Sequence, residues 1–331
     1  MKNGELWYDT DGNVIHAHGG WILKAGDYYY WYGENRTGDA YVSCYRTKDF
    51  KSFEFRNHVL TVNSKSAKRC TCCNNCADLN LKNPVESFGS AYEPNPLKRV
   101  TESNELFVNI ERPKVVYCEE TGKYVMWMHY ENGNDYLKAS CAIASCDTPD
   151  GDFIYHGSFK PFGVMARDCT VFSDNGEHYF IAAGRDNSDM YVYRMAEDCL
   201  NTDKIANIIY PNFIREAPAF FRKDDKIFFL SSACSGWNPN QGTYGYAKEG
   251  TMEGRWSLLS KFGDETTFRS QPAFVLPVEK DGKTEYYYFG DRWGGRGNNY
   301  FNSTYVVLKI QFDQDGMPFI EYSDEAQLPI I

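Results

Sequence analysis

Four polar side chains occupy matching positions of a repeated pattern along the chain: Glu111, Asp168, Glu216 and Gln271. Carboxyl groups that share a site can divide the work of acid–base catalysis, because one holds a proton while another group activates water. This requires the four side chains to lie close together, although they are far apart in the sequence. For each residue taken alone, the alternative is a solvated polar start of a strand; agreement across several repeats weakens that alternative.

The repeat that carries these residues has five copies, which begin at His16, Glu111, Arg167, Glu216 and Ser270. In each copy a short apolar run, a turn signal and a second aromatic-rich run follow, which is typical of a β-hairpin. The four polar anchors are spaced by 57, 48 and 55 residues. Repeats of about 40–50 residues with four strands each indicate a propeller.

We therefore expect an all-β fold, a five-bladed β-propeller, with residues 1–331 in a single domain. A short strand pair after each hairpin, as at 190–194 and 304–310, would complete a blade. The innermost strand of each blade lines the central channel. The polar residue that opens each copy should then lie near the axis, and the four anchors should converge.

The first interval of the repeat is longer than the others, with 93 residues between His18 and Glu111. We expect the excess, at about 61–109, to form an inserted loop on one face. It contains four thiols in seven residues, those of Cys70, Cys72, Cys73 and Cys76. A metal site, reactive or disulfide-forming thiols, and no role at all remain open for this cluster. The other cysteines stand singly in apolar runs, which predicts buried thiols.

Charge and hydropathy restrict the partners. The net charge is −10, from 35 Lys and Arg against 45 Asp and Glu, and there is no basic run. Nucleic acid and anionic membrane surfaces are disfavoured on this ground, whereas a neutral carbohydrate is compatible. No window approaches the roughly 20 apolar residues of a membrane span. The N-terminal residues lack the apolar stretch of a signal peptide, so we expect a cytoplasmic protein, or a secreted one if a leader was removed. No residues show the spacing of known cofactor or metal ligands, and we expect neither a cofactor nor a bound metal ion.

Several motifs together resemble glycoside hydrolase family 43, and within it the branch that contains exo-β-1,3-galactanases. The motifs are His16-Ala17-His18-Gly19-Gly20, Trp31-Tyr32-Gly33-Glu34, Glu111-Arg112-Pro113-Lys114, Arg167-Asp168-Cys169-Thr170, Arg215-Glu216-Ala217-Pro218, Ser235-Gly236-Trp237, Ser270-Gln271-Pro272-Ala273 and Gly290-Asp291-Arg292-Trp293. The resemblance implies a five-bladed propeller and an inverting hydrolase of plant polysaccharides. It implies exo-acting release of galactose from β-1,3-galactan chains.

The resemblance also implies roles for the anchors. Glu216 matches the catalytic acid and Asp168 matches the aspartate that tunes it, with Glu111 and Gln271 in the same site. The aspartate base that most of the family carries on the first blade has no match, because the equivalent segment, with His16 and His18, offers no carboxylate. Gln271, Glu111 or one of these histidines remains as the group that activates water. Our hypothesis is that Gln271 positions the water and that Glu111 assists it or binds a sugar hydroxyl.

Further residues are expected to bind substrate: His18, Glu34, Ser235, Trp237, Asp291, Arg292 and Trp293. For the two tryptophans the alternative is a place in the core, and for Glu34 and Arg292 it is simple solvation at a strand end. His129 is expected to be a satisfied core histidine.

Three other functions remain in competition. An α-L-arabinofuranosidase or β-xylosidase would use the same scaffold with a different sugar. A non-catalytic carbohydrate-binding propeller would explain the missing first-blade aspartate. A protein-interaction propeller is disfavoured because its repeats are usually more regular than those found here.

Overall fold

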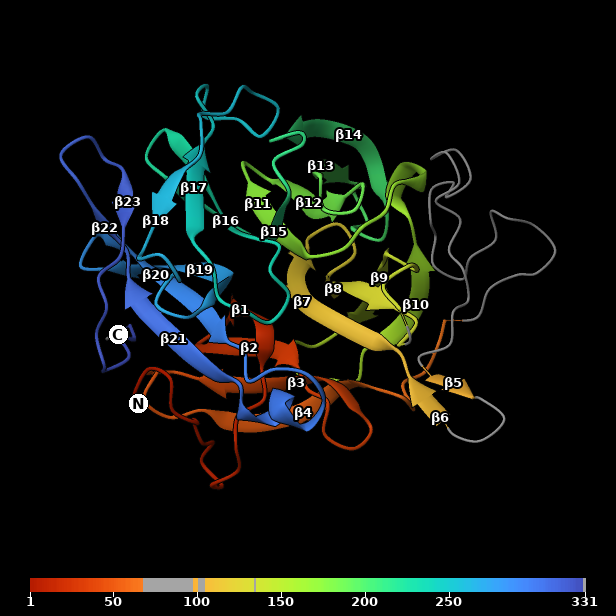
Figure 1. Cartoon of the computed structure of the whole chain (residues 1–331). Coiled ribbons are helices and arrows are strands. Elements are labelled where there is room, and N and C mark those ends of the chain that lie inside the picture. The colour runs from red at the N-terminus through yellow and green to blue at the C-terminus, as the bar shows by residue number, and fades with distance from the viewer. Residues whose placement is uncertain (68–97, 101–104, 134, 330–331) are drawn as a thin grey trace.

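The structure is a computed structural model that describes residues 1–67, 98–100, 105–133 and 135–329. In this part of the chain, five sheets surround a common axis, and the helices are two short 3-10 segments, Pro161–Gly163 and Gly297–Asn302 (Figure 1). The prediction of an all-β, five-bladed propeller is confirmed. Within the described residues, no helix has the length and apolar character needed to span a membrane.

The sheets follow one another along the chain as blades 1 to 5. Blade 1 contains β1 (His18–Ala25), β2 (Tyr28–Glu34), β3 (Ala40–Thr47) and β4 (Glu54–Thr61). Blade 2 contains β7 (Asn109–Cys118), β8 (Lys123–Glu131), β9 (Ser140–Cys146) and β10 (Ile154–Phe159). Blade 3 contains β11 (Cys169–Asp174), β12 (Glu177–Gly184), β13 (Asp189–Met195) and β14 (Thr202–Ile209). Blade 4 contains β15 (Arg215–Lys223), β16 (Lys226–Ala233), β17 (Gly242–Tyr246) and β18 (Ser260–Phe262), and blade 5 contains β19 (Gln271–Lys280), β20 (Lys283–Arg292) and β21 (Thr304–Lys309).

The first strand of every blade faces the axis. These strands contact one another in the order β1, β7, β11, β15, β19, and β19 returns to β1, which closes the ring. Blade 5 departs from our expectation, because 304–310 holds the single strand β21 instead of a strand pair. Both chain ends lie against this strand: the amide of Gly4 donates to the carbonyl of Tyr305 at 2.9 Å, and that of Gln327 donates to Val307 at 2.9 Å. The termini therefore cover an edge that a fourth strand would otherwise pair.

The turn signals of the sequence form the expected hairpins. In blade 3, Asp174 pairs with Glu177, which leaves Asn175 (φ 51°) and Gly176 (φ 80°) as a two-residue loop. Positive φ at both loop residues is the type I′ geometry that matches the twist of paired strands, and Asn-Gly favours it. The local sequence therefore sets the register of this hairpin, and with it the position of β11, the strand that follows Asp168.

The innermost strands share an irregularity near the end that carries the polar anchors. Pairing shifts register there between β1 and β2, β7 and β8, β15 and β16, and β19 and β20. Three of these β-bulges contain a residue in the left-handed region: Gly19 (φ 55°), Arg112 (φ 51°) and Ala217 (φ 55°). Bulges bend a strand and re-aim its side chains. The same device therefore places Glu111 and Glu216 at equivalent positions in their blades.

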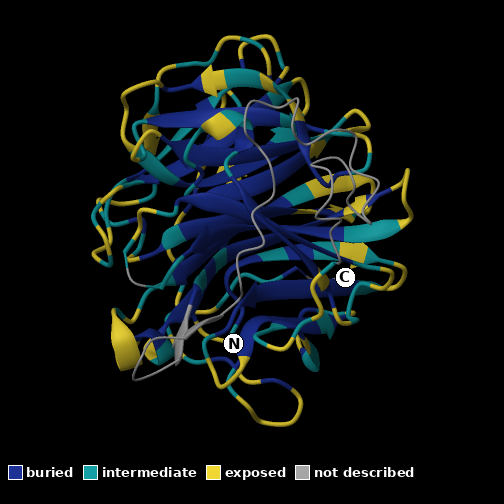
Figure 2. Ribbon diagram, turned by 90° about the vertical axis from the view of Figure 1, so that its right-hand side faces the viewer, coloured by how far each residue is buried: buried dark blue, intermediate teal, exposed yellow. Residues whose placement is uncertain are grey.

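The core consists of five apolar clusters, one at each junction between neighbouring blades. Figure 2 shows the inner parts of the sheets as a continuous buried region. Aromatic side chains dominate these clusters, as at the junction of blades 2 and 3, where Trp127 packs on Phe180 with ring centroids 4.6 Å apart.

Of the seven cysteines in the described residues, five are buried as predicted: Cys44, Cys118, Cys141, Cys169 and Cys199. Cys146 is partly exposed and Cys234 is exposed.

The expected insertion at about 61–109 overlaps the end of β4 and a hairpin of β5 (Lys98–Val100) with β6 (Glu105–Phe107). Cys70, Cys72, Cys73 and Cys76 lie outside the described residues, so their role stays as open as the sequence left it.

We predict that Trp127→Ala lowers the free energy of unfolding by about 3–5 kcal/mol, the usual range for removal of a fully buried aromatic side chain. Trp127 has an exposed fraction of 0%, and its indole N–H donates to the carbonyl of Cys199 at 2.9 Å, so both packing and a buried hydrogen bond are lost. Denaturant unfolding measures the effect. Leu258→Ala is the control, because Leu258 is 83% exposed and its removal should change stability by less than about 0.5 kcal/mol. Equal effects of the two substitutions would contradict the assignment of this core.

Candidate active site

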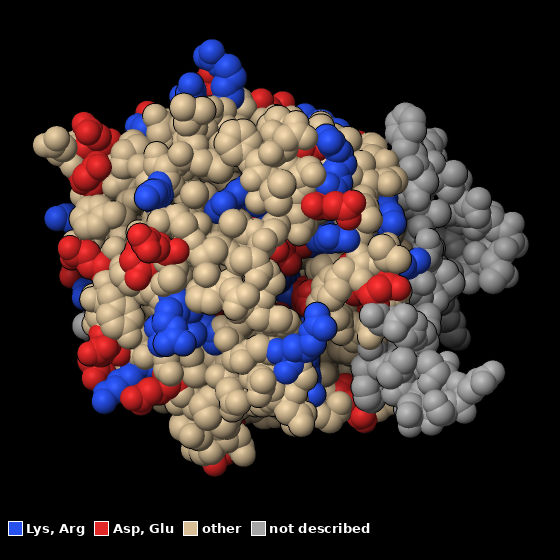
Figure 3. Space-filling view, in the orientation of Figure 1, with Lys and Arg blue, Asp and Glu red and all other residues tan. Residues whose placement is uncertain are grey.

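A cavity of about 270 Å³ lies where the innermost strands end. All five blades contribute to its wall, through Glu34, Arg36, Glu111, Arg112, Tyr136, Asp168, Glu216, Gly236, Trp237, Gln271, Trp293 and Arg296. Figure 3 shows acidic and basic side chains next to each other in the hollow near the middle of this face. The prediction that Glu111, Asp168, Glu216 and Gln271 lie close together is therefore confirmed.

Glu216 is a carboxyl group prepared to hold a proton. It lies in the bulge of β15, and burial, followed by the negative charge of Asp168, raises its pKa to about 7. Asp168 is fixed beside it, because a carboxylate oxygen of Asp168 accepts a hydrogen bond from the backbone N–H of Ala217 at 3.0 Å. A carboxylic acid that is still protonated near neutral pH can serve as a general acid.

Arg112 links the groups around Glu216. Its side chain is 3% exposed, and its Nε lies 2.8 Å from a carboxylate oxygen of Asp168. The guanidinium also donates to the side-chain oxygen of Gln271 at 2.6 Å and to the carbonyl of Pro272 at 3.0 Å. One buried cation thus joins blades 2, 3 and 5, and its charge partly opposes the upward shift of the Glu216 pKa.

The amide of Gln271 has no unused hydrogen-bonding group. Its oxygen accepts from Arg112 at 2.6 Å and from the indole N–H of Trp293 at 2.8 Å, two partners that can only donate, which fixes the orientation of the amide. Its nitrogen donates to Glu216 Oε1 at 3.0 Å and to the hydroxyl of Ser232 at 3.0 Å. A water molecule held by Gln271 would have to replace one of these four partners.

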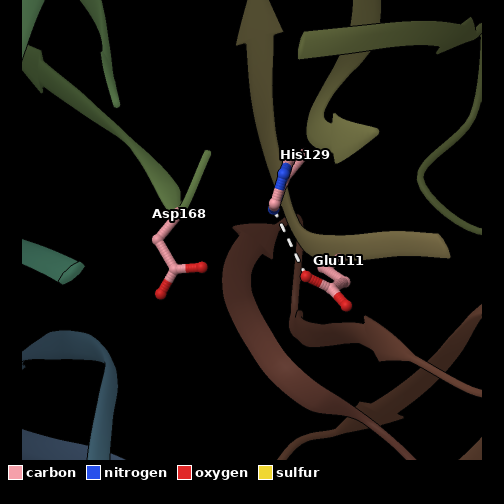
Figure 4. A group of neighbouring side chains, drawn as sticks. All are labelled: Glu111, His129 and Asp168. Atoms are coloured by element: carbon pink, nitrogen blue, oxygen red, sulfur yellow. Dashed lines mark ion pairs between the residues drawn. The ribbon is translucent and has the colours of Figure 1, made fainter. Parts of the chain in front are cut away.

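Glu111 is a strongly stabilised anion. It accepts from the hydroxyl of Tyr136 at 2.7 Å and from Arg36 at 3.1 Å, and it lies 3.3 Å from Nδ1 of His129 (Figure 4). Burial alone would raise its pKa, but the hydrogen bond and charge of His129, with the charge of Arg36, lower it to about 2. Burial likewise opposes the charged form of His129, while Glu111 and Glu131 raise its pKa to about 9. His129 is buried, as expected from the sequence, and it lies between the carboxylates of Glu111 and Glu131, which favour its charged form.

Glu111, His129 and Asp168 offer potential metal ligands within 4.8 Å of one another (Figure 4). Each carboxylate already faces a positive group of the protein, Arg36 or His129 for Glu111 and Arg112 for Asp168. A divalent cation would have to compete with these fixed charges. The cluster is better described as an ion-pair network that positions the two carboxylates.

The predicted substrate-binding residues divide into two groups. Glu34, Trp237 and Trp293 line the cavity, and Glu34 is 2% exposed, which rules out solvation at a strand end. The two indoles meet edge to face with ring centroids 5.6 Å apart, on the wall of the cavity and outside the core clusters. Such faces suit the apolar side of a sugar ring.

The other four do not line this cavity. Asp291 and Arg292 line a second cavity of about 50 Å³, which shares part of its wall with the first. His18 is buried behind the site with Nδ1 3.2 Å from Asp291, and Ser235 closes a turn by donating to the carbonyl of Asn238 at 2.5 Å. Neither His18 nor Ser235 is among the residues that line the two cavities.

Four further residues line the cavity although no role was predicted for them: Arg36, Arg112, Tyr136 and Arg296. Arg36 is two residues from Glu34, and Arg112 directly follows Glu111. An arginine this close to a predicted acidic site residue could have indicated both. Tyr136 and Arg296 come from connecting segments with no distinguishing pattern.

Comparison with known proteins places this site in a family. The sequence profile of glycosyl hydrolases family 43 matches residues 113–318, more than half of the chain. The chain belongs to this family. The match contains Asp168, Glu216 and Gln271, whereas blade 1 and Glu111 lie before it. A comparison with curated proteins gave no match.

Among solved structures, an exo-β-1,3-galactanase from Clostridium thermocellum is 39% identical, with a TM-score of 0.82, and the alignment covers 98% of this chain and 65% of that one. An exo-β-1,3-galactanase from Phanerochaete chrysosporium is 27% identical, with a TM-score of 0.78, and covers 98% of this chain and 67% of that one. A putative exo-β-1,3-galactanase from Bifidobacterium bifidum is 28% identical, with a TM-score of 0.78, and covers 99% and 98%. This family member therefore spans just under two thirds of the Clostridium chain and nearly all of the Bifidobacterium one.

We predict that Asp168→Asn shifts the basic limb of the pH profile of kcat/KM to lower pH. The substitution removes an anion from beside Glu216 and leaves Arg112 without its partner, and both changes lower the pKa of Glu216, so the acid loses its proton at lower pH. Activity at pH 8 should fall by about tenfold, which is less than the roughly 10²–10⁴-fold that complete loss of a general acid costs. The control is Asp174→Asn, at the far end of β11, where Asp174 pairs with Arg222 at 2.6 Å. An unmoved basic limb in Asp168→Asn would contradict the tuning role.

Proposed function

We propose that this family member is an inverting, exo-acting hydrolase that releases galactose from β-1,3-galactan chains. The observation that carries the proposal is the pair formed by Glu216, whose pKa burial and the charge of Asp168 raise to about 7, and Asp168, which accepts a hydrogen bond from the backbone N–H of Ala217 at 3.0 Å. The pair lies in a cavity whose wall contains the partly exposed indoles of Trp237 and Trp293. These are the parts that protonation of a glycosidic oxygen and binding of a sugar ring require.

In the proposed reaction Glu216 gives its proton to the oxygen that leaves C1 of the terminal galactose. Its Oε1 accepts from Gln271, so the proton belongs on Oε2. Gln271 in turn is held by Arg112 and Trp293. The neutral amide thereby orients the acid for transfer, and Asp168 keeps the pKa high enough for the proton to be present.

The sugar and its linkage rest on the relatives. The structures named above carry 27–39% identity to this chain and are described as exo-β-1,3-galactanases, one of them putative. The protonated Glu216 beside Asp168 speaks against a non-catalytic carbohydrate-binding propeller, because binding alone does not require a carboxyl group with a raised pKa.

We predict that Glu216→Gln lowers kcat for β-1,3-galactooligosaccharides by about 10²–10⁴-fold, because the amide cannot donate a proton to the leaving oxygen. Wild type and variant are compared on galactan, arabinan and xylan oligosaccharides, with the anomer of the released sugar followed by NMR. Wild type should release α-galactose first. An aryl galactoside with an acidic leaving group should restore most of the activity of the variant, since such a group needs no proton.

Two outcomes would overturn the proposal. Release of arabinose or xylose in place of galactose would leave the chemistry in place but refute the substrate. Binding of galactan without turnover, unchanged by Glu216→Gln, would refute the enzyme mechanism.

A further inference from the structure

The second cavity, of about 50 Å³, is not used by the reaction proposed above. Its wall shares four residues with the first cavity: Gly236, Trp237, Gln271 and Trp293. We propose that the second cavity is a subsite for an acidic group on the galactan chain, a carboxylate or a sulfate ester, with Arg269 and Arg292 as its cations. The proposal rests on the hydrolytic function above and adds a substrate class to it.

The two arginines offer hydrogen-bond donors that the protein leaves unused. Arg269 lines the second cavity, and its guanidinium has no ion-pair or hydrogen-bond partner within the described residues. Arg292 donates from Nη2 to the carbonyl of Phe268 at 2.9 Å, but its Nε is buried and has no acceptor in the same part of the chain. A buried donor without an acceptor is unfavourable. An acceptor oxygen of a ligand would remove this penalty, and two guanidinium groups favour an anionic oxygen.

The carboxylate nearest to these arginines is already paired elsewhere. Asp291 is the one acid that lines the second cavity among the described residues. One of its oxygens accepts from the backbone N–H of Gly19 at 2.9 Å, and the other lies 3.2 Å from Nδ1 of His18. Both oxygens of Asp291 therefore have partners in blade 1, and neither arginine forms an ion pair with it.

A strained segment holds Arg269 at the second cavity. Three successive residues lie in the left-handed region: Thr267 (φ 51°), Phe268 (φ 54°) and Arg269 (φ 60°). This conformation is unfavourable for residues other than glycine, and it persists only where the surrounding structure enforces it, often at ligand-binding positions. Asp264 enforces it here by accepting from the backbone N–H of Phe268 at 2.6 Å, and Arg292 holds the carbonyl of the same residue. The backbone thus keeps Arg269 close to Arg292.

The sizes of the two cavities fit a sugar ring and an acidic group. The first cavity, of about 270 Å³, contains Glu216 and can take a sugar ring against Trp237 and Trp293. The second has room for only a few water-sized groups, which suits a carboxylate or a sulfate and excludes another ring. Because both indoles also border the second cavity, a sugar in the first cavity can extend an acidic group past them to the arginines.

The first cavity adds one further free cation. Arg36 and Arg112 form ion pairs with carboxylates of its wall. Arg296 is exposed on the same wall and has no ion-pair or hydrogen-bond partner in the described part of the chain. Three arginines without a carboxylate partner therefore line the two cavities of a chain whose net charge is −10. Such a local field attracts an acidic sugar although the protein as a whole repels anions.

The experiment compares kcat/KM for matched oligosaccharides. One pair is a β-1,3-galactooligosaccharide with a hexuronic acid substituent and the same compound after reduction of its carboxyl group to an alcohol. The other pair is a sulfated β-1,3-galactooligosaccharide and its desulfated form. Wild type should prefer the acidic member of at least one pair by about 5–10-fold, since a partly exposed ion pair contributes less than a buried one. The pair that shows the preference identifies the acid, and added salt should weaken the preference by screening.

Two variants of Arg269 test the subsite itself. Arg269→Gln should reduce the preference to about twofold or less, and Arg269→Glu should reverse it, because a carboxylate there repels the acidic group. The matched control is Arg255→Glu, which makes the same change of charge at an exposed arginine that lines neither cavity and pairs with Glu249. This variant should keep the preference of wild type. Thermal unfolding checks that all three variants are folded.

Two results would overturn the subsite: equal kcat/KM for the acidic and neutral members of both pairs in wild type, or a preference that persists in Arg269→Glu. Failure of wild type to cleave any neutral member would instead refute the proposed function. Calorimetric binding of the same pairs to wild type and to Arg269→Glu then still tests the subsite, since binding of the acidic group does not require turnover.

Discussion

The site depends on a buried guanidinium. Arg112 is nearly inaccessible, and it holds Asp168, the side chain of Gln271 and the backbone of Pro272 together at the axis. A buried charge is tolerated only when it is well paired and hydrogen-bonded, and removing one partner is costly because the other is left uncompensated. The four carboxyl groups of Glu34, Glu111, Asp168 and Glu216 can share one cavity because Arg36 and Arg112 pair with three of them.

The ring geometry decides which of these groups meet. Four of the five innermost strands, β1, β7, β15 and β19, have a register shift near the end that lines the cavity, whereas β11 pairs with β12 without one. Neighbouring blades then bring their residues into direct contact, as with Asp168 and the amide of Ala217 or Gln271 and Glu216. Groups from blades that are not neighbours face one another across the cavity. The pKa of Glu216 is therefore set by groups on neighbouring blades.

Much of this follows from sequence, because the repeat and its turn residues are local signals. Asn175-Gly176 sets the turn of one hairpin. The spacing of the four polar anchors indicates which residues occupy equivalent positions in their blades. The hydrogen bonds of Gln271 could not be predicted in the same way, since its four partners come from blades 2, 4 and 5 and meet only when the ring is closed. For the same reason the low pKa of Glu111 could not be predicted from the sequence, because its partners Arg36 and Tyr136 belong to two connecting segments.

In the first blade the innermost strand β1 carries no carboxylate, and a carboxylate at the end of β2 lines the cavity instead. Lys114 is fully buried and donates to the carbonyls of Gly19 at 2.5 Å and Gly20 at 2.9 Å, which ties the bulge of β1 to blade 2. A Cβ at Gly20 would come within 2.4 Å of the carbonyl oxygen of Tyr32, so β1 and β2 lie too close for side chains at these positions. The close approach leaves no room for side chains at Gly19 and Gly20. Glu34, at the end of β2, lines the cavity next to these two glycines.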